Sequence, residues 1–249
     1  MKINGLWIKI IATLCMVVDH TGSVVFGTLI VEKGQNDLYL VAYILMRLIG
    51  RLAFPLFCFL ISEGVNYTHN LKQYVCRLWM FACISEVPYD FMRGTIWNPN
   101  AQNVGITLAL AATAELIAHT SSINRFVCYG IASGIAAFLH ADYGAAGVAL
   151  IFLLISSKDK QKKIAAAICG STYSVYYMFT QLHMGYLFIT MSTVLIGTIL
   201  YWIIRHYSPV VHKQKPRRFP KYWFYAVYPG HMLVLGMFLQ IIYKTLDIT

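Results

Sequence analysis

Two neighbouring ionisable residues, Asp19 and His20, interrupt an apolar segment near the N-terminus. Lys9 precedes His20 by eleven positions, and at about 100° per residue this spacing puts both side chains on one helical stripe, roughly 16 Å apart along the axis. A histidine with a carboxylate partner can act as a general base or carry an acyl group. Asp19 lies about 100° round the helix from His20, so the spacing leaves open whether they bond. We interpret both as catalytic; a helix-packing histidine is the alternative.

Two arginines form a second candidate group. Arg47 and Arg51 are four residues apart and therefore neighbours on one helix face. Two buried guanidinium groups repel each other unless an anion lies between them. The spacing leaves two choices open, namely an internal carboxylate from Glu63, Glu86 or Asp90, or the phosphates of a ligand such as coenzyme A.

The last apolar segment holds a second histidine, His231, directly after a Pro-Gly pair. Such a pair loosens a helix and frees backbone groups beside a cavity, so we interpret His231 as a catalytic residue too. Arg51, Tyr225 and His231 are candidate donors to an oxyanion. The tyrosines of 222–228, Tyr228 included, are equally typical of an aromatic belt at a membrane interface.

The elements that position these side chains must lie in a membrane. Of the 249 residues, 58% are hydrophobic and 12% are charged, and the mean hydropathy is +0.60. Soluble domains carry about 25% charged residues, so this chain is not a soluble globular or disordered protein, nor a soluble nucleic-acid binder despite its net charge of +10. A charge at bilayer depth costs at least roughly 2.5–3.5 kcal/mol, which predicts a polar cavity inside the bundle.

Nine apolar segments predict an all-α, polytopic integral membrane helix bundle of about nine transmembrane helices, with a range of eight to ten, in a single domain over residues 1–249. The fourth to seventh segments are short for a ~30 Å hydrocarbon core, so one or two could be re-entrant. The segments are 6–30, 38–62, 74–92, 105–119, 126–139, 144–157, 164–179, 183–204 and 223–243.

Positive charge predicts the orientation. Most of the twenty Lys and Arg residues fall in loops that a cytoplasmic N-terminus would place inside the cell. The most basic stretch, 205–221, is then a cytoplasmic loop, typical of a topogenic signal or of contact with anionic membrane lipid. The six cysteines include no C-x-x-C and predict neither metal nor disulfide. Gly130 and Gly134 form a small-residue pattern typical of helix packing.

The segments together resemble the TraX family, integral membrane proteins linked to N-acetylation of conjugative pilin. The spacing of Lys9 and His20 is also similar to the Arg/Lys-x10-His pattern of the wider transmembrane acyltransferase group, which includes bacterial sugar O-acetyltransferases and the lysosomal heparan glucosaminide N-acetyltransferase. The segments that carry the TraX resemblance, in family order, are LWIKIIATLCMVVDH (6–20), RLIGRLAFPLF (47–57), 62–64 with Thr68, Tyr74 and 77–78, ISEVPYD (84–90), ADYG (141–144) and FYAVYPGH (224–231).

The resemblance implies acetyl transfer from cytoplasmic acetyl-CoA, as co-substrate, to an amine or hydroxyl of an acceptor at the outer side of a bacterial cytoplasmic membrane. It implies that His20 is catalytic with Asp19 beside it. The acceptor, whether a peptide such as pilin or a glycan, and the oligomeric state are not set by the sequence. The positions expected to serve acyl-CoA or to line its passage are Lys9, Arg47, Arg51 and Arg77, and the further intramembrane polar positions are Glu63, Glu86, Asp90, Asp142 and Tyr228.

Two other classes compete with an enzyme. An ion- or proton-coupled transporter would also use intramembrane Asp, Glu, Arg and His. Transporters often carry internal repeats, whereas here the ionisable residues concentrate in the first third of the chain without a second copy. A non-enzymatic scaffold for envelope assembly is disfavoured by the density of charge inside the apolar segments.

Overall fold

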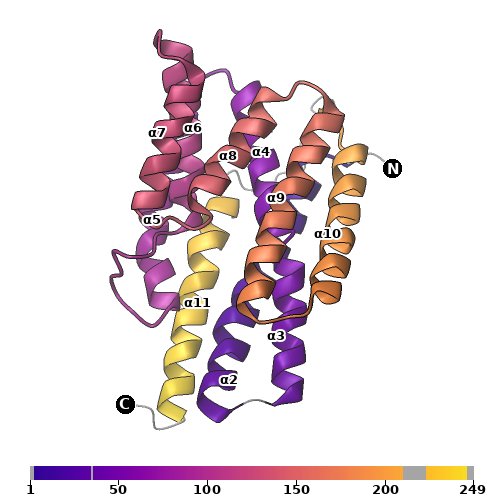
Figure 1. Cartoon of the computed structure of the whole chain (residues 1–249). Coiled ribbons are helices and arrows are strands. Elements are labelled where there is room, and N and C mark those ends of the chain that lie inside the picture. The colour runs from indigo at the N-terminus through magenta and orange to yellow at the C-terminus, as the bar shows by residue number, and fades with distance from the viewer. Residues whose placement is uncertain (1–2, 35, 210–222, 246–249) are drawn as a thin grey trace.

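The computed structural model describes residues 3–34, 36–209 and 223–245, and over these residues the regular structure is helical, with two isolated bridges (Figure 1). This confirms the predicted all-α bundle. The elements are α1 (Gly5–Thr21), the π-helical η1 (Gly22–Phe26), α2 (Gly27–Lys33), α3 (Asp37–Gly50), α4 (Ala53–Tyr67), α5 (Leu71–Met92), α6 (Val104–Thr120), α7 (Arg125–Phe138), α8 (Gly144–Ser156), α9 (Lys160–Gln181), α10 (Tyr186–His206) and α11 (Trp223–Thr245).

Two long stacks begin the chain, because α1, η1 and α2 follow one another directly and only two residues separate α3 from α4. Each predicted apolar segment therefore coincides with one helix or one stack. Four of these are long and apolar enough to cross a membrane: Gly5–Lys33, Asp37–Tyr67, Tyr186–His206 and Trp223–Thr245. The chain is thus a helical membrane protein. The number of crossings and the cytoplasmic N-terminus stay predictions.

The hairpin of α7 and α8 is shorter than a membrane is thick. The helices have 14 and 13 residues, or about 20 Å each at 1.5 Å per residue, against a hydrocarbon core of about 30 Å. Their connecting tip, residues 139–143, contacts α6, where the Thr107 hydroxyl donates to the Asp142 carbonyl at 2.6 Å. The expectation of short or re-entrant segments fits this hairpin, whereas α9, with 22 residues, is longer than predicted.

Asparagine or aspartate side chains cap the start of six helices. Each N-cap accepts a backbone N–H that has no partner within the first helical turn, which is the usual reason for Asn or Asp at this position. The capping residues are Asn4, Asn36, Asn70, Asn103, Asn124 and Asp159. The sequence thereby fixes where the helices of the bundle start.

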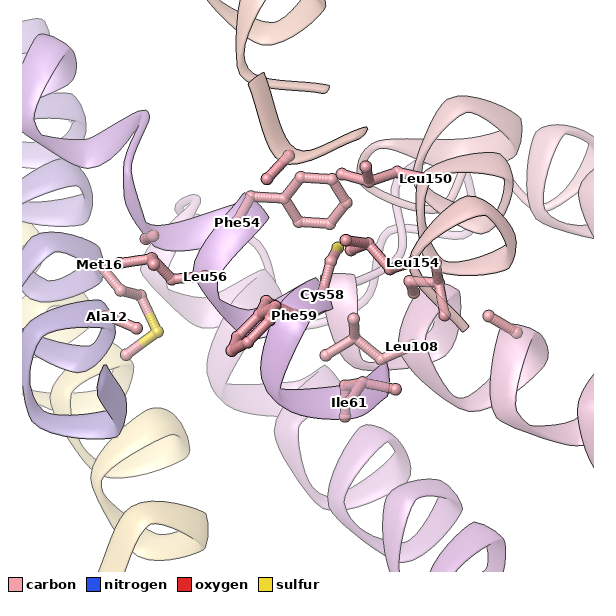
Figure 2. Close-up of a cluster of buried hydrophobic side chains, with 14 of the residues drawn as sticks. Ala12, Met16, Phe54, Leu56, Cys58, Phe59, Ile61, Leu108, Leu150 and Leu154 are labelled. Carbon is pink, nitrogen blue, oxygen red and sulfur yellow. The ribbon is translucent and has the colours of Figure 1, made fainter. Parts of the chain in front are cut away.

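The core gathers around α4, which packs against α1 on one side and against α6, α8 and α9 on the others. Figure 2 shows Met16 of α1 beside Leu56 of α4, while Phe54 and Cys58, also of α4, point toward α8. Leu56 and Cys58 are fully buried. The buried apolar side chains of α4 therefore hold α1 and α8, the two neighbours that carry or approach the charged residues, in fixed positions.

One end of the bundle ties together segments that are distant in the sequence. Ile3 pairs with residues 206–208 through two backbone hydrogen bonds of 2.9 Å, and the Lys160 ammonium donates to the carbonyls of Arg205 and Tyr207 at 2.7 Å. The predicted basic loop continues from here, and its residues 210–222 lie outside the described residues.

Candidate active site

A single carboxylate joins the first two helical stacks. Asp19 of α1 accepts from Arg47 Nη1 through Oδ2 at 2.6 Å and from Arg51 Nη2 through Oδ1 at 2.7 Å. Asp19 and Arg51 are 8% and 7% exposed. Buried charges of opposite sign at this distance neutralise each other, and each oxygen of the carboxylate serves a different arginine.

The anion shared by the arginines is therefore Asp19, and not one of the carboxylates that the sequence suggested. Glu63 bonds Lys163 of α9, and Glu86 bonds Asn103 at the start of α6. Asp90 accepts the backbone N–H of Asn98 at 2.9 Å. Of the two alternatives left open for the arginines, the structure shows an internal carboxylate, and the residue is not one of the three named, because helix spacing does not reveal which side of α1 faces α3.

Two glycines let α1 and α3 approach closely enough for this contact. A Cβ at Gly22 would lie 2.7 Å from the Cβ of Met46, and one at Gly50 would overlap the Asp19 carboxylate. Contacts this short do not occur between ordinary side chains. By contrast, Gly130 and Gly134, the pattern that predicted helix packing, have no atom within 4 Å of a built Cβ.

Two residues that sequence reasoning missed complete the surroundings of Arg51. Its Nη1 donates to Ser174 Oγ of α9 at 3.2 Å and to the Tyr143 hydroxyl at 3.3 Å, while its Nε donates to the Arg47 carbonyl at 3.2 Å. The ring of Tyr143 stacks on Phe54 at 3.5 Å between centroids. Tyr143 belongs to the ADYG segment (141–144) that carries part of the family resemblance, but nothing in the sequence indicates that a tyrosine in a loop is buried.

The two histidines meet across α1 and α11. His20 Nδ1 and His231 Nε2 are 2.7 Å apart, and His231 Nδ1 lies 2.8 Å from the carbonyl oxygen of Val227. Tyr228 is buried beside them, with its ring centre 6.4 Å from that of His20. Asp19 is the chain neighbour of His20 but bonds the arginines instead of the ring, which answers the question that the spacing left open.

These groups surround a cavity of about 450 Å³, within the range of small-molecule sites. It continues to Thr28 near the start of α2, to Arg93 just after α5 and to Tyr243 near the end of α11. The predicted residues that line it are Asp19, His20, Arg47, Arg51, Asp142 and Tyr228.

Lys9 and Arg77, two of the predicted cofactor-binding residues, lie away from this cavity. The Lys9 ammonium is 6.0 Å from the ring centre of Phe224, and the Arg77 guanidinium is 5.9 Å from that of Tyr74. The contact of Lys9 with Phe224 and that of His20 with His231 show that both side chains lie on the face of α1 toward α11, as their spacing predicts.

The charged pairs outside the cavity hold helices together. Glu115 of α6 accepts from Arg125 Nε and Nη2 at 2.9 Å and from the Tyr129 hydroxyl at 2.9 Å. Across the described ranges, no group of three His, Cys, Asp or Glu side chains has the geometry to hold a metal ion, and the six cysteines are free.

The fold and the site define a class of protein: a helical membrane protein with a buried, charged cavity that holds a paired histidine. A family model described as TraX protein matches residues 4–239, so the chain belongs to the TraX family. The chain is similar to the probable fimbrial assembly protein FimC, serogroup H1, of Dichelobacter nodosus, with 28% identity over 94% of this chain and 96% of that one. No solved structure matches.

Proposed function

We propose that this protein is a membrane-embedded acetyltransferase, which moves an acetyl group from cytoplasmic acetyl-CoA to an amine or hydroxyl of an acceptor outside the cytoplasm. The observation that carries the proposal is His20, which lines the cavity and is bonded at one ring nitrogen by a second histidine. An imidazole held in this way has its other nitrogen available for proton transfer.

In this scheme His20 takes the proton from the acceptor as its nitrogen or oxygen attacks the thioester carbonyl. The carbon–sulfur bond then breaks, and the leaving thiolate takes the proton back from His20. Transient acetylation of His20 itself is the variant of the scheme that the same geometry allows.

Arg47 is the best-placed donor to the oxyanion of this reaction. Its side chain lines the cavity, and among the described residues its hydrogen bonds to other side chains use Nη1 alone, which donates to Asp19. Each of the three nitrogens of Arg51 already donates to Asp19, Tyr143, Ser174 or a carbonyl. Donors aimed at a developing negative charge are worth about 10²–10³ in kcat each.

The phosphates of acetyl-CoA fit better near Lys9 and Arg77 than in the cavity. Both cations lie near the first turn of α11, since Lys9 contacts Phe224, and Phe81, one turn after Arg77 on α5, contacts Tyr225. The predicted topology puts this end in the cytoplasm, where acetyl-CoA is found. The fimbrial relative favours a subunit of a surface fibre as acceptor over a glycan.

The test is transfer of radiolabelled acetyl from acetyl-CoA by purified membranes, followed in parallel by release of free thiol. We expect the wild type to release thiol and His20→Ala to abolish both signals without loss of the folded protein on size exclusion. His206→Ala is the matched control, because His206 is half-buried at the end of α10 and does not line the cavity.

Retained activity in His20→Ala would remove His20 from the mechanism. A wild type that moves ions or protons across vesicles and releases no thiol would favour the transporter. Mass spectrometry of envelope peptides and glycans from cells with and without the protein identifies the acceptor by the mass of one acetyl group.

A further inference from the structure

We infer that His231 is a positioning residue, which fixes the hydrogen of His20 on Nδ1 and so leaves Nε2 of His20 as the basic nitrogen in the cavity. The catalytic meaning of this inference rests on the proposed function, whereas the hydrogen assignment rests on the contacts alone. The sequence predicts that both histidines are catalytic. In this arrangement their roles differ: His20 contacts the substrate, and His231 acts through His20.

A backbone carbonyl sets the tautomer of His231. His231 Nδ1 lies 2.8 Å from the oxygen of Val227, one turn earlier on α11. A carbonyl oxygen only accepts hydrogen bonds, so His231 Nδ1 must carry a hydrogen. In a neutral imidazole the other nitrogen is then an acceptor, so His231 Nε2 directs a lone pair at His20 Nδ1.

The tautomer of His231 in turn sets the tautomer of His20. His20 Nδ1 lies 2.7 Å from His231 Nε2, and two lone pairs cannot face each other at this distance. His20 Nδ1 therefore donates, and the neutral ring of His20 has its lone pair on Nε2. Among the described residues no hydrogen bond involves His20 Nε2, and His20 lines the cavity while His231 does not.

The orientation of the rings supports a directed hydrogen bond between them. Their planes differ by 11°, and their centres are 5.0 Å apart. This separation equals about the length of the hydrogen bond plus the two distances from ring centre to nitrogen. The rings thus lie edge to edge in nearly one plane, with the N–H of His20 pointing along the lone pair of His231.

Tyr228 and the fold keep the pair in this arrangement. The ring centre of Tyr228 lies 5.8 Å from that of His231 at an interplanar angle of 71°, so its edge blocks rotation of both imidazoles. Tyr228 is buried at 5% exposure. A second ring that anchors the first to a backbone carbonyl is the arrangement that holds a catalytic histidine in one tautomer.

Nitrogen-15 NMR of histidine-labelled protein in nanodiscs tests the inference without any activity. We expect His20, identified by the signal lost in His20→Gln, to show a protonated Nδ1 and an unprotonated Nε2 at neutral pH. His231→Gln keeps an acceptor oxygen near the position of Nε2, so we expect the same signals. His231→Leu removes the acceptor, and we expect a mixture of tautomers.

Kinetics provide the second readout. We expect His231→Leu to lower kcat by about 10²-fold, the range of general-base catalysis, with KM for acetyl-CoA unchanged, and His231→Gln to restore most of it. His206→Leu is the matched control, since His206 Nδ1 bonds the carbonyl of Trp202 at 2.8 Å in the same local geometry.

A wild-type His20 that carries its hydrogen on Nε2, or a His20 tautomer that His231→Leu leaves unchanged, would overturn the inference. If the nitrogen signals follow the expectation and no acetyl transfer is found, the assignment stands and the proposed function fails. The Gln variant and the wild type decide the question even if His231→Leu does not fold.

Discussion

Asp19 balances charge at the centre of the molecule. It binds Arg47 and Arg51 at once, and Asp142 faces the same cavity. Two arginines are thus matched by two aspartates, so the cluster has little net charge to offer to the phosphates of a ligand. Fixed dipoles and an N–H of Arg47 remain, which suit a small developing charge better than a nucleotide.

Removing the Asp19 carboxylate leaves the guanidinium groups of Arg47 and Arg51 without their shared counter-ion. Asp19→Asn keeps the shape of the side chain, and we expect it to lower the free energy of unfolding by about 3–5 kcal/mol, the cost of breaking a buried ion pair. Thermal unfolding in detergent measures the change.

The control for this substitution is the pair of Arg125 and Glu115 at a helix end, where the Arg125 side chain is 34% exposed. We expect Arg125→Gln to cost less than Asp19→Asn, because Arg125 is partly exposed and the Glu115 carboxylate keeps the Tyr129 hydroxyl as a donor, whereas Asp19→Asn leaves two cations without a counter-ion. Equal losses from the two variants would show that burial does not set the strength of the Asp19 cluster.

Tyr143 separates a hydrogen bond from a stacking contact. Tyr143→Phe loses the hydroxyl that accepts from Arg51 but keeps the stack on Phe54, so we expect a loss of about 0.5–1.5 kcal/mol in stability. Tyr143→Ala also removes the ring, and we expect about 3–5 kcal/mol. Chemical unfolding of both variants decides, and a Phe variant as unstable as Ala would assign the whole effect to the hydroxyl.

At the scale of elements, the close approach of α1 and α3 depends on Gly50. We expect Gly50→Ala to destabilise the protein by about 1–3 kcal/mol, the usual cost of overpacking, and to weaken the bonds of Asp19 to the arginines. Gly130→Ala on α7 is the matched control, because nothing lies near its Cβ position. We expect it to be neutral or stabilising by up to about 1 kcal/mol.

Thermal unfolding of both variants in the same detergent is the measurement. A neutral Gly50→Ala would mean that α3 can move away from α1 at little cost. It would then follow that the small residue at position 50 does not set the distance between these two helices.

The helices were predictable from the sequence, and the contacts between them were not. Apolar length marked every segment, and the asparagine caps mark where helices begin. The face of each helix is a property of its neighbours, so the sequence named Asp19, Arg47 and Arg51 without showing that they meet. It pointed to Gly130 and Gly134 for packing, while the close approaches occur at other glycines, Gly22 and Gly50 among them.

The tip of the α7–α8 hairpin shows the same limit. Its residues His140 and Tyr143 have backbone φ angles of 51° and 61°. Residues other than glycine seldom adopt such positive φ angles without support from surrounding contacts. Those contacts come from Gln102, which pairs with Ala141, and from Arg51 on another helix. Local sequence therefore could not predict that this loop reaches the arginines.

At the scale of the whole molecule, the mouth of the cavity and the two cations Lys9 and Arg77 lie toward opposite ends of the bundle. The cavity reaches Thr28, Arg93 and Tyr243, which share one end with the loop between α2 and α3. Lys9 and Arg77 lie toward the opposite end, near the starts of α1 and α5. Under the predicted orientation and the proposed acetyltransferase function, an acceptor would enter from outside and acetyl-CoA from inside, with His20 between them.

Cysteine labelling tests this orientation directly. In a background without the six native cysteines, we expect Asn36→Cys, between α2 and α3, to react with an impermeant maleimide in intact cells. Ser157→Cys, between α8 and α9 and next to Lys158 and Lys160, should react only after permeabilisation, because positive loops stay in the cytoplasm. The reverse pattern would turn the cavity toward the cytoplasm, where donor and acceptor would have to arrive from the same side and transfer across the membrane would be lost.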